Sequence, residues 1–339
     1  MENILHNDIL YGCCEITEPA AIDIIASPFF QRLRHIDQGG YAPLFAKPYS
    51  LDNKEKRYEH SRFTHSIGVF LLLRSYKAPF EEQIAGLLHD ISHSAFSHCI
   101  DYVLDSGSET LHTHQDNFHN EYILKTDIPD ILKKYGFPLD YILDDKNFPL
   151  KERELPDLCA DRIDYSLRTA RVFEENNPDN TNFFLANLRV QDKTWYFADY
   201  ESAKRYALLF RNLNETYYAG IHSAIMFRAV GDALKYALQK NYINQKDLYT
   251  TDDEVIEKIK RKIHLDDRLS LLWKRMNNTI HAKNNPENYE SSVFCKSRIV
   301  DPYFAVGSEI KRISDVDPEW KEVLIKESRP KKYFIQFEK

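Results

Sequence analysis

Residues 84–98, which read IAGLLHDISHSAFSH, organise both the expected fold and the expected chemistry of this chain. The apolar start of this stretch is typical of a helix, and it leads directly into the adjacent pair His89 and Asp90. His93 and His98 follow within about two and a half helical turns, and the spacing of His89 and His93 predicts that they share one helix face. Nitrogen and oxygen ligands at the end of an apolar helix suit a catalytic divalent metal better than a structural zinc. A buried histidine–aspartate hydrogen bond explains the pair alone equally well.

Composition bounds the class of protein. A chain of 339 residues can bury a sizeable core, in one large domain with additions or in two domains. Glycine is scarce, with 10 residues, and neither nucleotide-binding glycine fingerprint occurs. The net charge of −7 does not favour binding along duplex nucleic acid. A basic cluster of Arg329, Lys331 and Lys332 is read as a solvated tail.

Cysteine usage and the N-terminal residues predict a cytoplasmic location. The five cysteines form no C-x-x-C pair and are odd in number, which is typical of reduced thiols. The opening residues, MENILHNDILYG, lack the basic start and apolar run of a signal peptide. Because the longest apolar runs, such as 69–73, cannot cross a bilayer, we expect a soluble protein without a membrane partner.

Hydrophobic periodicity predicts a mainly α protein. Apolar residues recur at helical spacing in the segments 16–36, 66–76, 81–88, 98–104, 117–135, 158–171, 200–240, 252–262 and 269–276. The stretch LRVQDKTWY at 188–196 is typical of a β-hairpin. Strand-like pieces at 299–306 and 333–337 add minor β structure late in the chain.

Three of these helices carry acids and imidazoles. The first opens with Arg62 and His65, and the second ends at His89 and Asp90. The third presents one polar stripe, made up of Asp157, Asp161, Asp164, Tyr165 and Arg168. Such a stripe usually faces water or forms salt bridges, but the many apolar residues beside it favour burial of part of it.

The order His65, His89-Asp90 and Asp161 resembles the H…HD…D pattern of HD-domain metal-dependent phosphohydrolases. Flanking stretches extend the resemblance to the dNTP triphosphohydrolase (dGTPase-like) branch of that superfamily: FQRLR at 30–34, RFTHSIG at 62–68, LLHDISHSAFSH at 87–98 and DRIDY at 161–165. The similarity runs from about residue 20 to residue 240, so it includes all three helices.

The resemblance implies an HD-domain helical bundle with a small β-hairpin and a mixed α/β C-terminal region. We expect an HD core in residues 1–185, the hairpin and long helices that complete the fold in 186–290, and a small appendage in 291–339. Because relatives commonly form dimers or tetramers, we also expect a homo-oligomer.

The resemblance further implies that His65, His89, Asp90 and Asp161 bind one divalent transition metal ion. Two imidazoles and two carboxylates suit Mn, Fe, Ni, Co or Zn, whereas Mg is an alternative that the nitrogen ligands disfavour. Such an ion neutralises phosphate charge, lowers the pKa of a water molecule and orients phosphorus for in-line attack.

The same match implies a catalytic group around the metal. His119 would be a general acid or would position the nucleophile, supported by Asp101. His114, about a turn and a half away, is the competing candidate. His93 and His98 would join this group through phosphate contacts.

Four further residues are implied to bind substrate. Arg62 and Arg162 would contact phosphate, and Tyr165 would stack on or hydrogen-bond to the sugar. Gln38 would meet the nucleoside.

The chain also departs from the relatives. Ser92 and Ala95 replace the usual Gly and Pro, and Thr169 replaces an acidic residue near the sugar. Ile221 and His222 stand where the relatives read the sugar with Tyr and Gln. The reaction type is therefore better supported than a dNTP substrate.

The polar loop at residues 41–60 is longer than in the relatives. It carries Lys47, Lys54, Lys56 and Arg57. These cations suit either a lid over a polyanionic substrate or an ordinary solvent-exposed loop.

Three functions remain open at this stage. The favoured one is a metal-dependent phosphohydrolase that cleaves an ester or anhydride bond of a nucleotide or another small phosphate. The second is a phosphodiesterase or nuclease on cyclic or short single-stranded nucleotides, which the negative charge does not favour. The third is a nucleotide-binding regulator with little turnover, against which the complete set of metal ligands argues.

Overall fold

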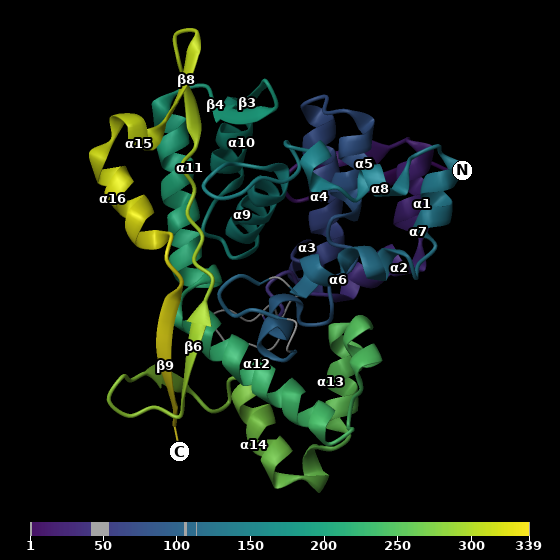
Figure 1. Ribbon diagram of the computed structural model, residues 1–339, viewed down its shortest axis with the longest axis vertical. Coiled ribbons are helices and arrows are strands. Elements are labelled where there is room, and N and C mark those ends of the chain that lie inside the picture. The colour runs from purple at the N-terminus through teal and green to yellow at the C-terminus, as the bar shows by residue number, and fades with distance from the viewer. Residues whose placement is uncertain (1, 42–53, 105–106, 113, 339) are drawn as a thin grey trace.

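The computed structural model describes residues 2–41, 54–104, 107–112 and 114–338, and helices dominate it (Figure 1). The helices are α1 (Pro19–Ala26), α2 (Pro28–Gln31), α3 (Lys54–Glu59), α4 (Arg62–Ser75), α5 (Phe80–Leu88), α6 (His114–Ile123), α7 (Ile128–Lys134), α8 (Leu139–Ile142), α9 (Ala160–Val172), α10 (Pro178–Asn187), α11 (Tyr200–Leu213), α12 (Ile221–Gln239), α13 (Asp252–Lys260), α14 (Asp267–Met276), α15 (Ile313–Val316) and α16 (Pro318–Glu327). A 3-10 segment, η3 (Ser97–Tyr102), replaces the α-helix expected at 98–104, and a π-helical turn, η5 (Asn214–Tyr218), follows α11. The expected helical character is confirmed, and the strands make the fold mixed α/β.

The strands form small sheets. They are β1 (Ile4–Asp8), β2 (Gly12–Ile16), β3 (Leu188–Gln191), β4 (Thr194–Phe197), β5 (Ala282–Asn284), β6 (Ser291–Cys295), β7 (Tyr303–Val306), β8 (Glu309–Arg312) and β9 (Lys331–Phe337). In the part of the chain that is described, the sheet orders are β1-β2, β3-β4-β7-β8 and β5-β9-β6. The hairpin expected at 188–196 is confirmed as β3 and β4. Strand β7 lies parallel to β4, and β9 lies between β5 and β6, so late residues complete sheets begun earlier in the chain.

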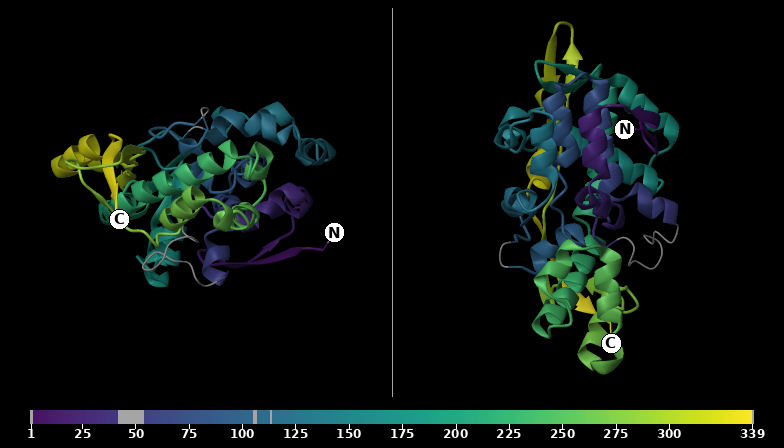
Figure 2. Two further views of the ribbon diagram at one scale, coloured as in Figure 1. Left: turned by 90° about the horizontal axis from the view of Figure 1, so that it is seen from below. Right: turned by 90° about the vertical axis from the view of Figure 1, so that its right-hand side faces the viewer.

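Helix α4 lies at the centre of the upper part of the molecule. Its residues from Arg62 to Leu73 are all buried, which is expected for a helix with neighbours on every side. Ser61 caps its N-terminus by accepting a hydrogen bond from the Thr64 amide. One core packs α4 against α1, α2, α5, α7 and α8, and a second packs it against α9 and α11. A third core joins α12, α14, η3, β6 and β9. Helices α12, α13 and α14 lie together at the bottom of Figure 1 and of the right-hand view in Figure 2.

Two glycines bring the three site-bearing helices close together. A Cβ at Gly68 of α4 would lie 2.1 Å from Oδ2 of Asp164 on α9. A Cβ at Gly86 of α5 would lie 2.6 Å from Cδ1 of Leu73 on α4. Because both distances are far below van der Waals contact, a larger residue at either position would displace the Asp164 or the Leu73 side chain.

Some local predictions were wrong. Helix α5 ends at Leu88, so His89 caps it and His93 lies beyond it rather than on a shared helix face. Helix α9 begins at Ala160, so Asp157 precedes the helix that was expected to carry it. The hairpin β1-β2, whose second strand ends at Ile16, was not anticipated.

The loop expected at 41–60 contains the short helix α3. Lys56 pairs with Glu174 at 2.5 Å and Arg57 pairs with Asp253 at 3.1 Å. Lys47 and the side chain of Lys54 lie outside the described residues, so the lid hypothesis stays a prediction.

Crossing a bilayer requires a helix that is both long and apolar. Across the described ranges, no helix combines the length and the apolar character needed to cross one.

Candidate active site

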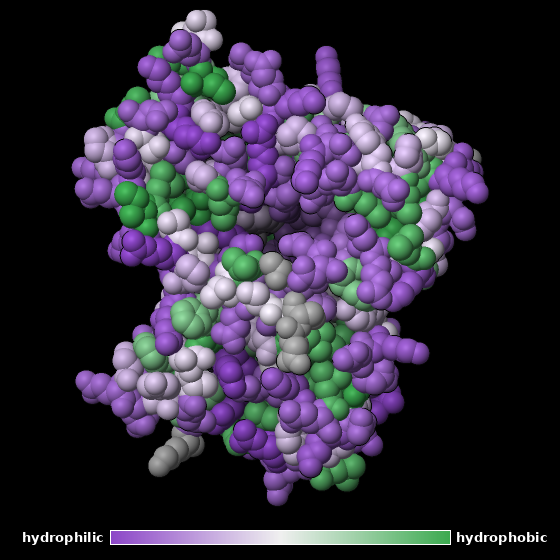
Figure 3. Space-filling model, viewed as in Figure 1, coloured by the Kyte–Doolittle hydropathy of each residue, from purple (hydrophilic) through white to green (hydrophobic). Residues whose placement is uncertain are grey.

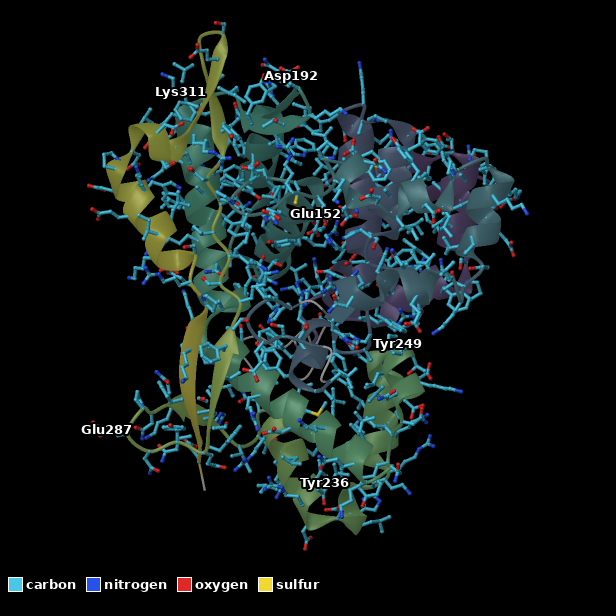
Figure 4. The ribbon with its side chains drawn as sticks, in the orientation of Figure 1. Glu152, Asp192, Tyr236, Tyr249, Glu287 and Lys311 are labelled. Carbon is cyan, nitrogen blue, oxygen red and sulfur yellow. The ribbon has the colours of Figure 1, made fainter. Side chains whose placement is uncertain are left out.

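A cavity of about 1020 Å³ opens near the middle of the molecule. The space-filling view shows a hollow there, surrounded mostly by hydrophilic residues (Figure 3). Glu152, which lines the cavity, lies at the same place in the stick view (Figure 4). Ten of the twelve predicted site residues line this cavity: Gln38, Arg62, His89, Asp90, His93, His98, His119, Asp161, Arg162 and Tyr165. The other two, His65 and Asp101, are buried.

Three side chains from three helices converge at the cavity wall. His65 Nε2 lies 2.9 Å from Asp161 Oδ1 and 3.1 Å from His89 Nε2. The His89 Nε2 and Asp161 Oδ1 atoms are 3.4 Å apart. These atoms lie within ligand distance of one another, as a shared cation requires. The sequence predicted this grouping, although His65, His89 and Asp161 span nearly a hundred positions.

Asp90 lies beside this group and is held by Arg62. Its carboxylate oxygens are 3.7 Å from His65 Nε2 and 3.5 Å from His89 Nε2. Arg62 donates to Asp90 Oδ2 at 2.7 Å, and its other nitrogens donate to the Gln38 carbonyl and the Ser97 hydroxyl. All three guanidinium nitrogens of Arg62 donate to protein atoms, but each Nη atom carries a second N–H and the residue lines the cavity, so the expected phosphate contact stays a prediction. In this structure Arg62 positions Asp90.

Both imidazoles are oriented through their second ring nitrogen. His65 Nδ1 donates to Asp164 Oδ1 at 2.8 Å, and His89 Nδ1 donates to the Gly86 carbonyl at 2.7 Å. Each ring therefore directs Nε2 at the shared point near Asp161, which is the arrangement found for metal-binding histidines.

A buried ionic network supports Asp164. Arg168 donates to both of its oxygens, at 2.9 and 3.0 Å, and Tyr11 donates to Oδ2 at 2.9 Å. Arg168 also binds Asp8 on β1 at 2.9 Å. Asp164 and Arg168 have no exposed surface. The hairpin β1-β2 therefore contributes to the orientation of His65.

The pKa shifts follow from this geometry. Burial disfavours the charged form of His65, but hydrogen bonds to Asp161 and Asp164 outweigh it and raise its pKa to about 9. Burial opposes ionisation of Asp161, yet its hydrogen bonds to His65 and His89 hold its pKa well below the usual value. Asp90 behaves in the same way, mainly because of Arg62. Two imidazole nitrogens and one carboxylate oxygen that meet at one point form a donor set that fits a divalent transition metal ion.

The predicted catalytic residues His93 and His98 lie side by side on the cavity wall, with ring centroids 5.3 Å apart. His93 Nε2 lies 3.2 Å from Asp90 Oδ1, and burial together with Arg62 lowers its pKa to about 4. His98 Nδ1 lies 3.7 Å from Asp101 Oδ2. Burial, with Arg62 next, lowers the pKa of His98 well below its usual value. Both rings are therefore neutral at pH 7.

The expected support of His119 by Asp101 is not the contact that the structure shows. His119 Nδ1 lies 2.8 Å from the Ser92 hydroxyl, while Asp101 Oδ1 accepts from the backbone amides of Ser108 and His114. Ser92, which departs from the relatives, thus replaces the carboxylate as the partner of His119.

His119 and His114 differ in their surroundings. His119 lines the cavity, and burial together with Lys151 lowers its pKa to about 4. His114 Nε2 instead lies 3.0 Å from the Tyr249 hydroxyl, and its ring stacks on Phe118. The geometry favours His119 as the residue that reaches a substrate.

The predicted substrate residues offer unused polar atoms. Gln38 Oε1 and Arg162 Nε are buried and have no hydrogen-bond partner within the described ranges. Arg162 Nη1 donates to the carbonyls of Arg153 and Asp157, which fixes the guanidinium. Tyr165 lines the cavity, and its ring lies 6.5 Å from that of His65.

Thr169, which stands where the relatives have an acidic residue, lies beside His60. Thr169 Oγ1 lies 3.3 Å from His60 Nε2, and Asp37 accepts from His60 Nδ1 at 3.0 Å. His60 and Thr169 both line the cavity. No local pattern in the polar segment 41–60 marked His60.

Sequence reasoning missed cavity residues that come from elsewhere in the chain. Lys151 follows α8, and Lys296 and Arg298 follow β6. No sequence motif marks any of these three residues, and only the folded chain brings them to the cavity.

Fold and site together define a largely helical protein with a buried histidine–aspartate centre in a polar cavity. The HD domain family model matches residues 62–166. An uncharacterised protein, YdhJ of Bacillus subtilis, is 33% identical over 297 residues, which cover 87% of each chain. Metal-dependent phosphohydrolase cns2 of Cordyceps militaris is 34% identical over 188 residues, or 56% of this chain and 51% of that one.

Two further comparisons concern the branch of the superfamily and the fold of the chain. Human deoxynucleoside triphosphate triphosphohydrolase SAMHD1 is 29% identical over 184 residues, which are 43% of this chain and 28% of that protein. The chain therefore spans about half of cns2 and about a quarter of SAMHD1. The fold matches a hypothetical protein from Aquifex aeolicus (TM-score 0.71, 21% identity, 99% and 96% of the two chains). It also matches a phosphohydrolase from Bacteroides thetaiotaomicron (TM-score 0.72, 18% identity, all of both chains).

The chain belongs to the HD-domain phosphohydrolase family and is a hydrolase that acts on phosphate ester bonds. The resemblance to the dNTP triphosphohydrolase branch, first seen in the motifs, is confirmed by the SAMHD1 matches.

Proposed function

We propose that this chain hydrolyses a phosphate ester or phosphoanhydride bond of a nucleotide, such as a dNTP or NTP. The observation that carries the proposal is the convergence of His65, His89 and Asp161 on a cavity of about 1020 Å³. That volume suits a whole nucleotide rather than a single phosphate group. The stacked rings of Phe173 and Tyr217, 4.6 Å apart, give the cavity wall an aromatic surface for a base or sugar.

We propose one divalent transition metal ion (Mn, Fe, Ni, Co or Zn, with Mg as the alternative) as the cofactor. His65, His89 and Asp161 would hold it, with Asp90 as the fourth ligand. When bound, the ion would neutralise phosphate charge and make a water molecule more acidic. The carbonyl of Gly86 and the carboxylate of Asp164 keep the two imidazoles in place.

Other residues of the chain would bind and orient the substrate. Arg162 and Tyr165 line the cavity beside Asp161, so we assign them to phosphate and sugar. Gln38 presents a buried oxygen without a described partner, which suits a donor group on the nucleoside. His93 and His98, neutral at pH 7, can donate hydrogen bonds to phosphate oxygens without charge.

His119→Ala is expected to lower kcat about 10²-fold, because a positioned histidine contributes about that much to proton transfer or nucleophile orientation. Its low pKa makes it neutral, which favours orientation of the nucleophile over proton donation. His114→Ala is the matched control, and we expect it to lower thermal stability while leaving kcat within about threefold. Steady-state kinetics and thermal melts of both variants decide the assignment. The reverse pattern would transfer the role to His114.

The proposed function is tested with a matrix of substrates and metals. The purified chain, stripped with a chelator and reloaded with Mn, Co, Ni, Zn, Fe or Mg, is incubated with dNTPs, NTPs, cyclic nucleotides, short oligonucleotides and p-nitrophenyl phosphate. We expect metal-dependent cleavage of nucleotides, lost on chelation and restored by metal. Preference for cyclic nucleotides or oligonucleotides would identify a phosphodiesterase or nuclease. Tight nucleotide binding without turnover under any metal would identify a regulator.

Three broader expectations stay proposals. We propose a homo-oligomer, which light scattering after gel filtration tests, and a cytoplasmic location. We also keep the boundaries 1–185, 186–290 and 291–339 as a proposed division of the chain. Limited proteolysis should cut near residues 185 and 290 if these are true boundaries.

A further inference from the structure

We propose that Lys296 and Arg298 form a subsite for a second phosphate group of the substrate, away from the metal ligands. This inference rests on the proposed function and adds a specificity determinant to it. The segment 296–298 lies outside the residues matched by the HD family model, 62–166, and follows strand β6. Its side chains nevertheless line the same cavity as His89 and Asp161.

The fold holds this segment in place from the end of α11. Asn214, the first residue of η5, donates from its amide nitrogen to the Ser297 hydroxyl at 3.0 Å. Its amide oxygen accepts from the Arg298 backbone amide at 2.8 Å. Asn214 is fully buried. These two hydrogen bonds fix the Ser297 hydroxyl and the Arg298 backbone amide. The side chains of Lys296 and Arg298 are therefore directed into the cavity.

The two cations lack the carboxylate partners that Arg62, Lys151 and Arg162 have in the same cavity. Arg62 pairs with Asp90, Lys151 with Asp145, and Arg162 with Glu152. Neither Lys296 nor Arg298 forms an ion pair with a described residue; the Arg298 guanidinium donates a long bond, 3.4 Å, to the Lys296 carbonyl and lies 5.9 Å from the centre of the Tyr218 ring. Both are partly buried. Unpaired, half-buried cations facing a cavity are a binding site for an anion.

The electrostatics of the surroundings agree with this geometry. Burial, followed by repulsion from Arg298, lowers the pKa of Lys296 to about 8. Burial first, with Arg298 and Lys296 among the other causes, holds the pKa values of His98 and His112 well below the usual range. Asp116 and Glu152 lie near Lys296 and partly offset the repulsion from Arg298, but neither forms an ion pair with Lys296 in the described part of the chain. An entering dianion would relieve the repulsion between the two cations.

The chemistry of the subsite selects a phosphate group. Arg298 offers a planar fork of donors and Lys296 a point charge, the combination that holds phosphate oxygens. The metal ligands already account for the phosphate that is cleaved. A substrate with a second phosphate therefore gains affinity that a simple monoester lacks.

Binding of inorganic tripolyphosphate tests the subsite without requiring turnover. Calorimetry on the metal-loaded chain, with metal content measured before and after, compares tripolyphosphate with orthophosphate. We expect the double variant Lys296→Gln/Arg298→Gln to bind tripolyphosphate at least about tenfold more weakly, because two charge-assisted contacts are lost. Orthophosphate binding should change less than about threefold. The matched control is Lys311→Gln/Arg329→Gln, which neutralises two exposed cations of the C-terminal region.

A charge-conserving swap distinguishes the loss of charge from a defect in folding. Lys296→Arg/Arg298→Lys should restore most of the tripolyphosphate affinity if charge is what matters. Tripolyphosphate affinity equal in the wild type and in the folded double-glutamine variant would overturn the proposal. So would failure of the wild type to bind tripolyphosphate more tightly than orthophosphate.

Kinetics separate this inference from the proposed function. With an active substrate, the double-glutamine variant should raise KM for a nucleoside triphosphate at least about tenfold and leave KM for the monophosphate near the wild-type value. Turnover with no such split would overturn the subsite and leave the proposed function standing. Weakened tripolyphosphate binding in a chain without turnover would support the subsite and reject the function.

Discussion

Asp161→Asn is expected to abolish metal binding and catalysis together, with kcat/KM lowered about 10³-fold or more. Asp161 Oδ1 lies 2.9 Å from His65 Nε2 and 3.4 Å from His89 Nε2, so the substitution removes a charged ligand at the point where both imidazoles meet. A metal that stabilises charge in phosphoryl transfer contributes several kcal/mol, which corresponds to a rate loss of this size. Elemental analysis and activity on the best substrate of the matrix measure both effects.

The control for this variant is Asp192→Asn, an equivalent change at an exposed turn between β3 and β4. It should keep the metal content and the rate of the wild type. Wild-type metal content and activity in Asp161→Asn would refute the ligand assignment, because no other described carboxylate lies as close to both imidazoles.

Arg168→Met is expected to destabilise the fold by about 3–5 kcal/mol, because it leaves two buried carboxylates without their cation. Arg168 binds Asp164 on its own helix and Asp8 on β1, and all three side chains are inaccessible to solvent. Urea denaturation at pH 7 measures the loss. Arg268→Met, at an exposed position of α14, should change stability by less than about 0.5 kcal/mol.

The pH dependence identifies the cause of that loss. Burial opposes ionisation of Asp8, but Arg168 outweighs it and holds the pKa of this carboxyl well below its usual value. In the wild type, this stabilisation is present above the unfolded pKa of about 3.9 and is lost as the pH falls through the folded pKa. In Arg168→Met the buried Asp8 carboxyl loses this cation, so its pKa is expected to rise and the variant gains stability on acidification. The gap between the two proteins should narrow from pH 7 to pH 4; a constant gap would point to lost packing instead.

Sequence could predict the site better than the fold that surrounds it. The motifs at His65, His89-Asp90 and Asp161 identified the converging groups because their flanks resemble a known family. Periodicity alone could not do this, since the polar stripe on α9 divides: Asp161 and Tyr165 face the cavity, whereas Asp164 is buried behind His65. Only the elements packed against the helix decide which side of such a stripe is exposed to solvent.

Other features lacked a local signal or gave a misleading one. The turn that carries His93 was read as helix because i and i+4 spacing does not reveal where a helix stops, and α5 stops at Leu88. The hairpin β1-β2 turns at Gly12, whose φ of +71° suits glycine, but two short strands beside a helical pattern were easy to miss. Lys296 and Arg298 lie at the cavity in a segment held by Asn214, a contact between residues more than eighty positions apart.

The π-helical turn after α11 has an evolutionary consequence. Its wide hydrogen bond runs from the Ala219 amide to the Asn214 carbonyl at 2.8 Å, five residues apart, so the turn accommodates one residue more than an α-helix would. Deleting one codon within 214–218 would tighten this turn to ordinary helical spacing and move the Asn214 side chain away from residues 297 and 298. Homologous sequences with a one-residue gap at this turn should therefore also have lost the basic pair after β6, and such covariation would be visible in an alignment.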